Sequence, residues 1–138
     1  MTLETAIHNR WTTDARLTRL VPTTRFVTGT ALSSPELPYV VLSAAKTRRL
    51  FRTSSGTTVE AATIVFRVWS ESLDDGLRIQ RAILQRFDRA EFTCPDGKTA
   101  AMRLADRESR QEGSQSWQTI LNFDAVLQFP EQEAVFHG

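Results

Sequence analysis

The sequence predicts an α+β fold, in which an antiparallel or mixed β-sheet of about four to five strands carries two main helices packed on one face. Three observations lead to this prediction. Residues 57–70 and 115–129 alternate side chains with the period of two that is typical of strands. Residues 73–90 repeat apolar residues with a helical period. No strand–helix–strand unit repeats, so the order α-β-β-α-β-β differs from that of a parallel doubly wound fold.

Residues 2–20 are expected to form a helix in two pieces. Apolar residues recur there every four positions and would share one helical face; they are Leu3, Ile7 and Trp11. Asp14 follows an interruption of this pattern and is a suitable N-cap for a short second helix. Pro22 then ends the helical segment, because a proline disfavours the helical conformation of the residue before it.

The first half continues with a connector and a hairpin. Residues 23–38 contain serines and prolines typical of loops, with a short edge strand expected at 25–28. A strand begins at Tyr39, residues 53–56 form a turn, and 57–70 form the second strand of an antiparallel hairpin. On that second strand one face is expected to be apolar, with Ala62, Ile64, Phe66 and Val68.

The helix at 73–90 should begin at Ser72, which resembles a capping box with Asp75. Its buried stripe is predicted to contain Leu77, Ile83, Leu84 and Phe87, with Leu73 and Ala90 near its ends.

The C-terminal half is expected to be a second hairpin. It contains a short strand at 91–94, a turn at 95–97, a strand at 99–107, a charged loop at 108–114 and a strand at 115–129. One face of this last strand is apolar and the other is expected to be mostly solvated. Residues 130–138 are interpreted as a tail that is flexible or ordered by a partner. The whole chain, 1–138, is predicted to be a single domain.

Composition excludes several classes of function. The chain has a formal net charge of +1, whereas a protein that wraps nucleic acid usually has a larger basic excess. Cys94 is the one cysteine, so no intrachain disulfide forms, as suits a reducing compartment. We expect no signal peptide and no membrane-spanning segment, because no apolar run is long enough.

The residues give little support for catalysis, metals or cofactors. His8, His137 and Cys94 do not form the closely spaced groups that zinc sites need. Cys94 is interpreted as a buried or half-buried structural residue. The pair Asp74–Asp75 is explained by helix capping, and the glycines are too scattered for a phosphate loop. The sequence therefore predicts no enzyme, no cofactor and no metal.

A basic run precedes the first hairpin turn and contains Lys46, Arg48, Arg49 and Arg52. Consecutive strand residues point to opposite faces, so Arg48 and Arg49 cannot share a face unless the strand bulges. Nucleic-acid contact would favour interleaved aromatic residues, and Phe51 is the one aromatic residue present. We interpret the run as a hairpin tip that faces solvent or another protein, with nucleic-acid contact as the alternative.

Three stretches resemble a known family. They are "PELPYVVLSAAKT" at 35–47, "VFRVWSES" at 65–72 and the helix "LDDGLRIQRAILQRF" at 73–87. With the order of elements, they resemble bacteriophage and prophage tail-completion (tail-terminator) proteins over residues 3–128. The shared motifs are apolar patterns rather than catalytic signatures, so no catalytic residue is implied.

The resemblance implies a structural subunit that forms a homo-oligomeric ring, typically a hexamer. The ring would cap the tail tube and join it to the head connector, in the virion tail or in the host cytoplasm during assembly. Partners would be the protein itself, the tail-tube protein and the head-completion protein. Interface candidates are Lys46, Arg48, Arg49, Phe51, Arg52, Arg107, Glu108 and Arg110. The alternative is a small α+β module that binds nucleic acid or a ligand without catalysis.

Overall fold

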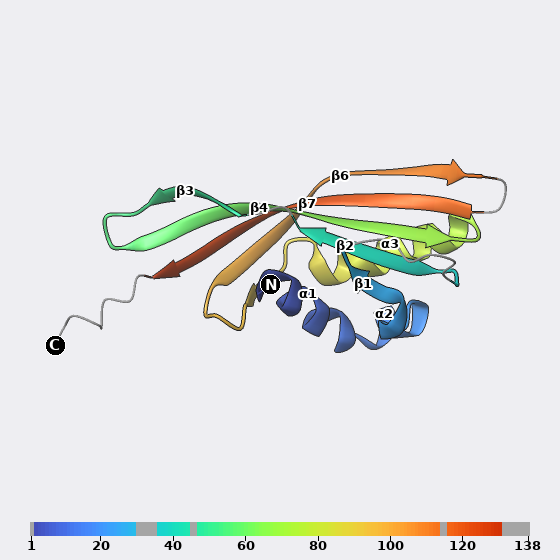
Figure 1. Cartoon of the computed structure of the whole chain (residues 1–138), viewed down its shortest axis with the longest axis horizontal. Coiled ribbons are helices and arrows are strands. Elements are labelled where there is room, and N and C mark those ends of the chain that lie inside the picture. Colours follow the sequence, from blue (N-terminus) through green and yellow to red (C-terminus); the bar gives the residue numbers. More distant parts are fainter. Residues whose placement is uncertain (1, 30–35, 45–46, 114–115, 131–138) are drawn as a thin grey trace.

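A seven-stranded mixed sheet forms the body of the protein, and the helices lie on one side of it (Figure 1). The computed structural model describes residues 2–29, 36–44, 47–113 and 116–130. Along the sheet the strand order is β1-β2-β4-β7-β6-β5, and β3 pairs with β4 beside the end of β2. The pair β1–β2 is parallel and the other pairs are antiparallel.

The strands are β1 (Phe26–Thr28), β2 (Tyr39–Ala44), β3 (Arg48–Arg52), β4 (Thr57–Ser70), β5 (Glu91–Thr93), β6 (Thr99–Glu112) and β7 (Ser116–Pro130). The helices are α1 (Thr2–Thr12), α2 (Ala15–Leu20) and α3 (Leu73–Phe87), with a 3₁₀ turn at Thr23–Arg25. The helices on one face and the mixed sheet agree with the predicted fold class. The predicted count of four to five strands is wrong, because the first arm of the first hairpin divides into β2 and β3 and because β1 and β5 join the sheet.

An aromatic cluster holds the helices against the sheet. Trp11 of α1 is fully buried and stacks on Phe26 with ring centroids 4.0 Å apart. Its indole Nε1 donates a hydrogen bond to the Val21 carbonyl at 3.3 Å, so burial leaves this polar atom satisfied. Phe66 of β4 packs against Phe87 of α3 at 5.2 Å. The predicted buried faces of α1 and β4 are thereby confirmed: Leu3, Ile7, Trp11, Ala62, Ile64, Phe66 and Val68 are buried.

Helix α3 begins as predicted, and its predicted buried stripe is confirmed at Ile83 and Phe87. The Ser72 hydroxyl accepts a hydrogen bond from the Asp75 backbone N–H at 3.1 Å. The predicted stripe is wrong at Leu77, which is 36% exposed. The residues of α3 that are buried are Gly76, Ile79, Gln80, Ala82, Ile83 and Phe87. The sequence pattern overlooked Gly76 because glycine carries no apolar side chain.

Gly76 marks the closest approach of α3 to the sheet. A Cβ atom at this position would lie 2.9 Å from the Ser70 Oγ and 3.0 Å from the Thr119 Oγ1. Both distances are shorter than carbon–oxygen contacts in packed interiors, so glycine allows the helix to sit this close. The helix ends at Phe87, three residues before the predicted end at 90, and Arg89 then adopts φ 61°.

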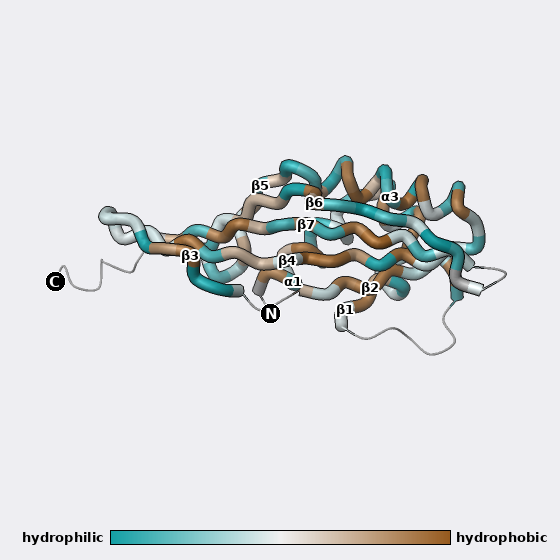
Figure 2. Tube along the Cα trace, turned by 90° about the horizontal axis from the view of Figure 1, so that it is seen from above, coloured by the Kyte–Doolittle hydropathy of each residue, from teal (hydrophilic) through white to brown (hydrophobic). Residues whose placement is uncertain are grey.

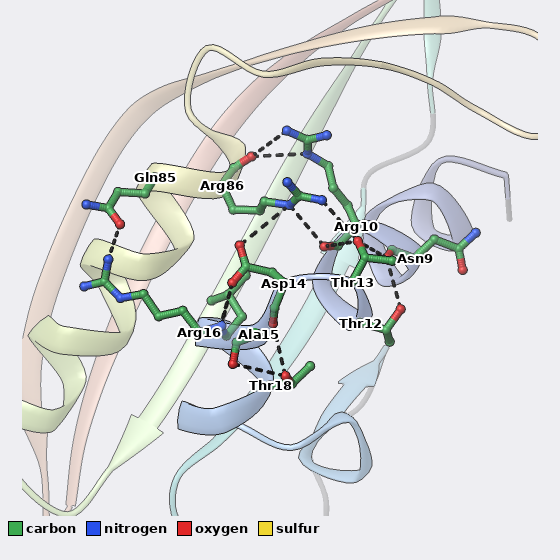
Figure 3. Close-up of polar contacts among 11 residues, drawn as sticks. Asn9, Arg10, Thr12, Thr13, Asp14, Ala15, Arg16, Thr18, Gln85 and Arg86 are labelled. Atoms are coloured by element: carbon green, nitrogen blue, oxygen red, sulfur yellow. Dashed lines mark hydrogen bonds and ion pairs between the residues drawn. The ribbon is translucent and has the colours of Figure 1, made fainter.

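Two arginines join the C-terminal ends of α1 and α3 (Figure 3). The Arg10 guanidinium donates to the Arg86 carbonyl at 3.2 and 3.0 Å, and Arg86 Nε donates to the Arg10 carbonyl at 3.2 Å. Arg86 also donates to the Thr13 hydroxyl and lies 3.8 Å from the Asp14 carboxylate. Because the last carbonyls of a helix lack intrahelical partners, each arginine stabilises the end of the other helix. Asp14 caps α2 as predicted, accepting from the backbone of Arg16 and Leu17.

The second hairpin is longer than predicted. Residues 108–112 were expected in a charged loop, but β6 continues to Glu112, which pairs with Ser116. The prediction is wrong here because residues that are exposed on both faces of a strand do not alternate in polarity. The outer face of β7 is also less solvated than expected, since Ile120 and Gln118 are only 8% and 5% exposed.

Candidate assembly interfaces

The basic run forms the edge strand β3 at one end of the sheet. β3 is joined to β4 by a turn in which Gly56 has φ 92°, a conformation that glycine adopts without strain. The Gly56 N–H donates to the Thr53 carbonyl at 3.0 Å, and the Thr57 N–H donates to the Thr53 Oγ1 at 3.0 Å. These bonds fix the hairpin tip, which projects beyond the helices (Figure 1). Lys46 lies outside the described residues.

A bulge sets which side chains of β3 share a face. Arg48 pairs with Ala61 and Arg49 with Glu60, and after the bulge Phe51 pairs with Val59 and Arg52 with Thr58. Residues paired across two strands place their side chains on the same face of the sheet, and consecutive residues of β4 place theirs on alternate faces. The even-numbered residues of β4 face the helices, as buried Phe66 does. Arg49 and Arg52 therefore lie on the helix side of the sheet, whereas Arg48 and Phe51 lie on the other side. The strand does bulge, but only after Arg49, so Arg48 and Arg49 stay on opposite faces.

β3 exposes apolar side chains among its arginines. Leu50 is 45% exposed and Phe51 is 55% exposed. In the described part of the chain β3 pairs with β4 alone, so its outer backbone edge is open. An open edge with exposed apolar residues is a template for an added strand. The sequence reasoning named Phe51 and missed Leu50, although an apolar residue inside a basic strand is the signal that could have identified it.

The C-terminal part of β6 forms a second open edge. β5 pairs only with residues 99–101 of β6, so from Asp106 onward one side of β6 has no neighbouring strand among the described residues. Figure 2 shows this part of β6 as mostly hydrophilic. Arg107 and Glu108 are exposed. The Asp106 carboxylate accepts from the Asn122 side-chain amide at 2.6 Å, and the Arg110 guanidinium donates to the side-chain oxygen Oε1 of Gln118 at 3.0 and 3.2 Å.

The structure separates the predicted interface residues into two surfaces. We call Arg48–Arg52 the β3 edge, and Asp106–Glu112 the β6 edge. Arg52 pairs with Thr58 of β4. Arg110 pairs with Gln118 of β7, and Gln118 pairs in turn with Trp69 of β4. Eleven residues at about 3.3 Å each place these two points roughly 36 Å apart along the strands. The two edges also lie at opposite lateral edges of the sheet. β3 pairs with β4 on the side where β2 lies, whereas β6 lies beyond β7 on the other side of β4.

The face of the sheet opposite the helices carries an aromatic pair that the sequence reasoning did not single out. The Tyr39 and Trp69 rings stack with centroids 4.7 Å apart and an interplanar angle of 4°. Beside them Arg67 Nη1 donates to the Ser43 Oγ at 3.4 Å. Burial raises the pKa of the Tyr39 hydroxyl. The cross-strand pairing of Tyr39 with Trp69 was a usable signal, because it follows from the register of the first hairpin.

Surface grooves lie on either side of β5. One, of about 340 Å³, lies between α1 and β5 and includes Arg10, Phe92 and Cys94. The other, of about 480 Å³, lies beside β5 and β6 and includes Arg89, Glu91 and Asp124. Cys94 is 3% exposed, and burial followed by the charge of Asp96 raises the pKa of its thiol. A raised pKa opposes formation of the reactive thiolate, so Cys94 has a structural environment.

The described residues contain no group of three or more histidine, cysteine or acidic side chains that could hold a metal ion. No described helix combines the length and apolar character needed to cross a membrane.

Comparison with known proteins identifies the family. The model of the family described as tail completion protein gp17 matches residues 5–128, which is most of the chain. The chain belongs to this family. A chain in the solved structure of the virion of a native gene transfer agent (GTA) particle has the same fold, with a TM-score of 0.73. That match covers 93% of this chain and 96% of the other, at 15% sequence identity. No curated protein sequence matches the chain.

Family membership confirms the resemblance to phage tail-completion proteins. The protein is a structural component of the virion tail.

Proposed function

We propose that this tail-completion protein assembles into a closed ring, of six subunits, that caps the tail tube and joins it to the head connector. The observation that carries the proposal is that one sheet has two open lateral edges, the β3 edge and the β6 edge, at opposite ends of its strand order. When two different surfaces of a subunit meet head to tail, the contact generates a ring if the rotation closes. In this role the protein is a single domain and has no catalytic activity.

The two edges suit contacts with proteins. The β3 edge combines arginines with exposed Leu50 and Phe51, and arginine and phenylalanine are enriched at the centres of protein interfaces. The β6 edge carries charges of both signs, including Arg107, Glu108 and Arg110. We assign these residues, with Lys46, to contacts with sister subunits, the tail-tube protein or the head-completion protein.

Size-exclusion chromatography with light scattering tests the ring. We expect a closed oligomer of about six times the 15.6 kDa subunit mass, either alone or after addition of tail-tube protein. Reversing the charge of Arg48 and Arg49 should weaken assembly, whereas R81E on the exposed face of α3 should not. A protein that stays monomeric at every concentration and is not retained by tail-tube protein would contradict the proposal. Binding to DNA that is lost in R48E/R49E while the ring persists would instead favour nucleic-acid contact at this hairpin.

A further inference from the structure

The open side of β6 presents backbone groups in a regular pattern. The N–H groups of Met102 and Leu104 point away from β7, to the Ala90 carbonyl and the Asp88 carboxylate. Inward and outward positions alternate along an antiparallel ladder, so the alternation on β7 fixes the outward positions of β6 beyond the bulge. These positions are Arg107, Ser109 and Gln111, which pair with residues 121, 119 and 117 of β7. Their N–H and C=O groups are therefore directed to the open edge.

The outward groups are spaced symmetrically about Ser109. A second β6, related by a two-fold axis through this residue, runs antiparallel to the first and pairs Ser109 with its own counterpart and Arg107 with Gln111. No like charges then face each other over residues 107–111, which matters because like charges directly opposite destabilise a strand pair. We propose that two free copies of this protein pair along their β6 edges about a two-fold axis at Ser109. This contact goes beyond the ring and occupies an edge that the ring also uses.

The flank of α3 beside this edge carries an exposed leucine between two charges. Leu77 is 36% exposed. With 3.6 residues per turn, it lies on the side of the helix opposite Arg86, which bonds to α1 and lies near Asp14. Leu77 is therefore turned toward β6, and Figure 2 shows α3 on the β6 side of the sheet. Asp74 and Arg81 share this flank, and neither forms an ion pair within the described part of the chain.

Leu77 is level with Ser109 along the strands. The Ser109 Oγ lies 3.2 Å from the Thr119 Oγ1. The same Thr119 oxygen is 3.0 Å from the position of a Cβ atom on Gly76, the residue before Leu77. A two-fold axis at Ser109 therefore passes near Leu77 and makes the two α3 helices antiparallel.

The antiparallel helices bring opposite charges together. Leu77 faces its counterpart, and Asp74, three residues before it, approaches Arg81, four residues after it, in the other copy. Because α3 contacts β4 and β7 at Gly76 and β6 at Asp88, its axis lies over β7 on average. Two such helices are three strand spacings apart, about 14 Å. A helix with side chains is about 10–12 Å wide, so the long Arg81 side chain reaches the Asp74 carboxylate across the remaining gap.

This set of groups is self-complementary, which favours a second copy over a strand of another protein. In a two-fold contact both copies present the same surface, so the pair of Asp74 with Arg81 forms twice. A foreign strand would satisfy the backbone of β6 without any need for an acid and a base on either side of Leu77. The dimer also covers an open edge that is a template for aggregation, and it has to separate before that edge joins a ring.

Single cysteines in the full chain test the register. In S109C the two cysteines face each other with Cα atoms about 5.5 Å apart, a distance that a disulfide bridges. In Q111C they are separated by four residues along the strands, about 14 Å, which is too far. Under mild oxidation we expect a dimer of about twice 15.6 kDa from S109C, little from Q111C, and a dimer again when Q111C is mixed with R107C. Native Cys94 is 3% exposed, which limits side reactions.

Exchange of charges tests the helix contact. D74R and R81D should each weaken dimerisation about tenfold in analytical ultracentrifugation, because each brings like charges together twice. D74R/R81D should restore the dimer, since the exchanged charges meet again across the axis. Within one helix the two positions are seven residues apart and do not interact, so an effect on folding alone gives no rescue. Circular dichroism checks that each variant is folded.

The outcomes separate this contact from the ring. The proposal is overturned if S109C cross-links no faster than Q111C, or if D74R/R81D dimerises no better than the single variants. A monomeric protein whose binding to tail-tube protein is lost in Q111P, which lacks the outward N–H, would also overturn it and assign the edge to a foreign strand. A closed ring without the S109C cross-link would reject the dimer and keep the ring. A cross-linked dimer that yields no ring after reduction and addition of tail-tube protein would support the dimer and reject the ring.

Discussion

Replacing Gly76 with alanine tests the close approach of α3 to the sheet. Alanine is better than glycine inside a helix by about 1 kcal/mol, so helix propensity alone predicts stabilisation. The structure predicts the opposite sign, because the new Cβ would lie 2.9 Å from the Ser70 Oγ and 3.0 Å from the Thr119 Oγ1. Ser70 is fully buried and its hydroxyl donates to the Ser72 carbonyl at 2.8 Å, so it cannot move without loss of that bond.

The expected net effect follows from these opposing terms. Overpacking a core by one methyl group costs about 1–3 kcal/mol, which outweighs the propensity gain and gives a net destabilisation of about 1 kcal/mol in G76A. Urea unfolding at a fixed protein concentration should show a lower midpoint with an unchanged slope. The fixed concentration matters because assembly would stabilise the folded state.

A double-mutant cycle provides the control. In an S70A background the Oγ is absent, and the nearest remaining Ser70 atom, Cβ, lies 3.9 Å from the position that the new methyl group would occupy. G76A should then cost less than in the original chain, with a coupling free energy of about 1 kcal/mol. Stabilisation by G76A in the original background would show that helix and sheet are not packed this closely, and an effect unchanged by S70A would show that the Ser70 Oγ is not the atom that opposes the new methyl group.

Three further predictions concern single side chains. R86A should lower the free energy of unfolding by about 1–3 kcal/mol, because it removes the hydrogen bonds from Arg86 to the Arg10 carbonyl and to the Thr13 hydroxyl. R81A on the exposed face of α3 should change it by less than about 0.5 kcal/mol in thermal or urea unfolding. Cys94 should react with iodoacetamide only as fast as the protein unfolds, and rapid labelling under native conditions would contradict its burial. Burial lowers the pKa of His8, against the opposing charge of Glu4, so the folded state binds its proton less readily than the unfolded state. Stability should therefore be full above the ordinary histidine pKa and fall as the pH drops through it, and H8Q should flatten this dependence in urea midpoints measured against pH.

Local signals in the sequence were sufficient for the elements that carry strong periodicity or a cap. β4, β7 and α1 were located because their buried residues recur at the strand or helix period, and Asp14 and Ser72 marked helix starts through their side-chain oxygens. The end of β6 was missed because it is exposed on both faces, which removes the alternation. The start of the α3 stripe was placed at Leu77 instead of Gly76, because Gly76 contacts the sheet through its lack of a side chain.

The interface candidates show a different limit. The basic run could be identified from composition, but the bulge after Arg49 decides which of its side chains share a face, and a bulge has no sequence pattern here. Likewise, Arg107 and Arg48 look like members of one charged set in the sequence. Only the strand order shows that they lie at opposite lateral edges of the sheet.

The central place of β7 has a consequence for biosynthesis. β7 is the last strand in the described part of the chain, yet it lies between β4 and β6 and pairs with every residue of β4. On the ribosome, the first 115 residues can form local hairpins and helices, but β4 lacks its longest partner until β7 has emerged. The nascent chain therefore acquires its native sheet only after β7 has emerged. A premature stop before Ser116 would leave the apolar face and edge of β4 uncovered, so such a fragment should aggregate rather than fold.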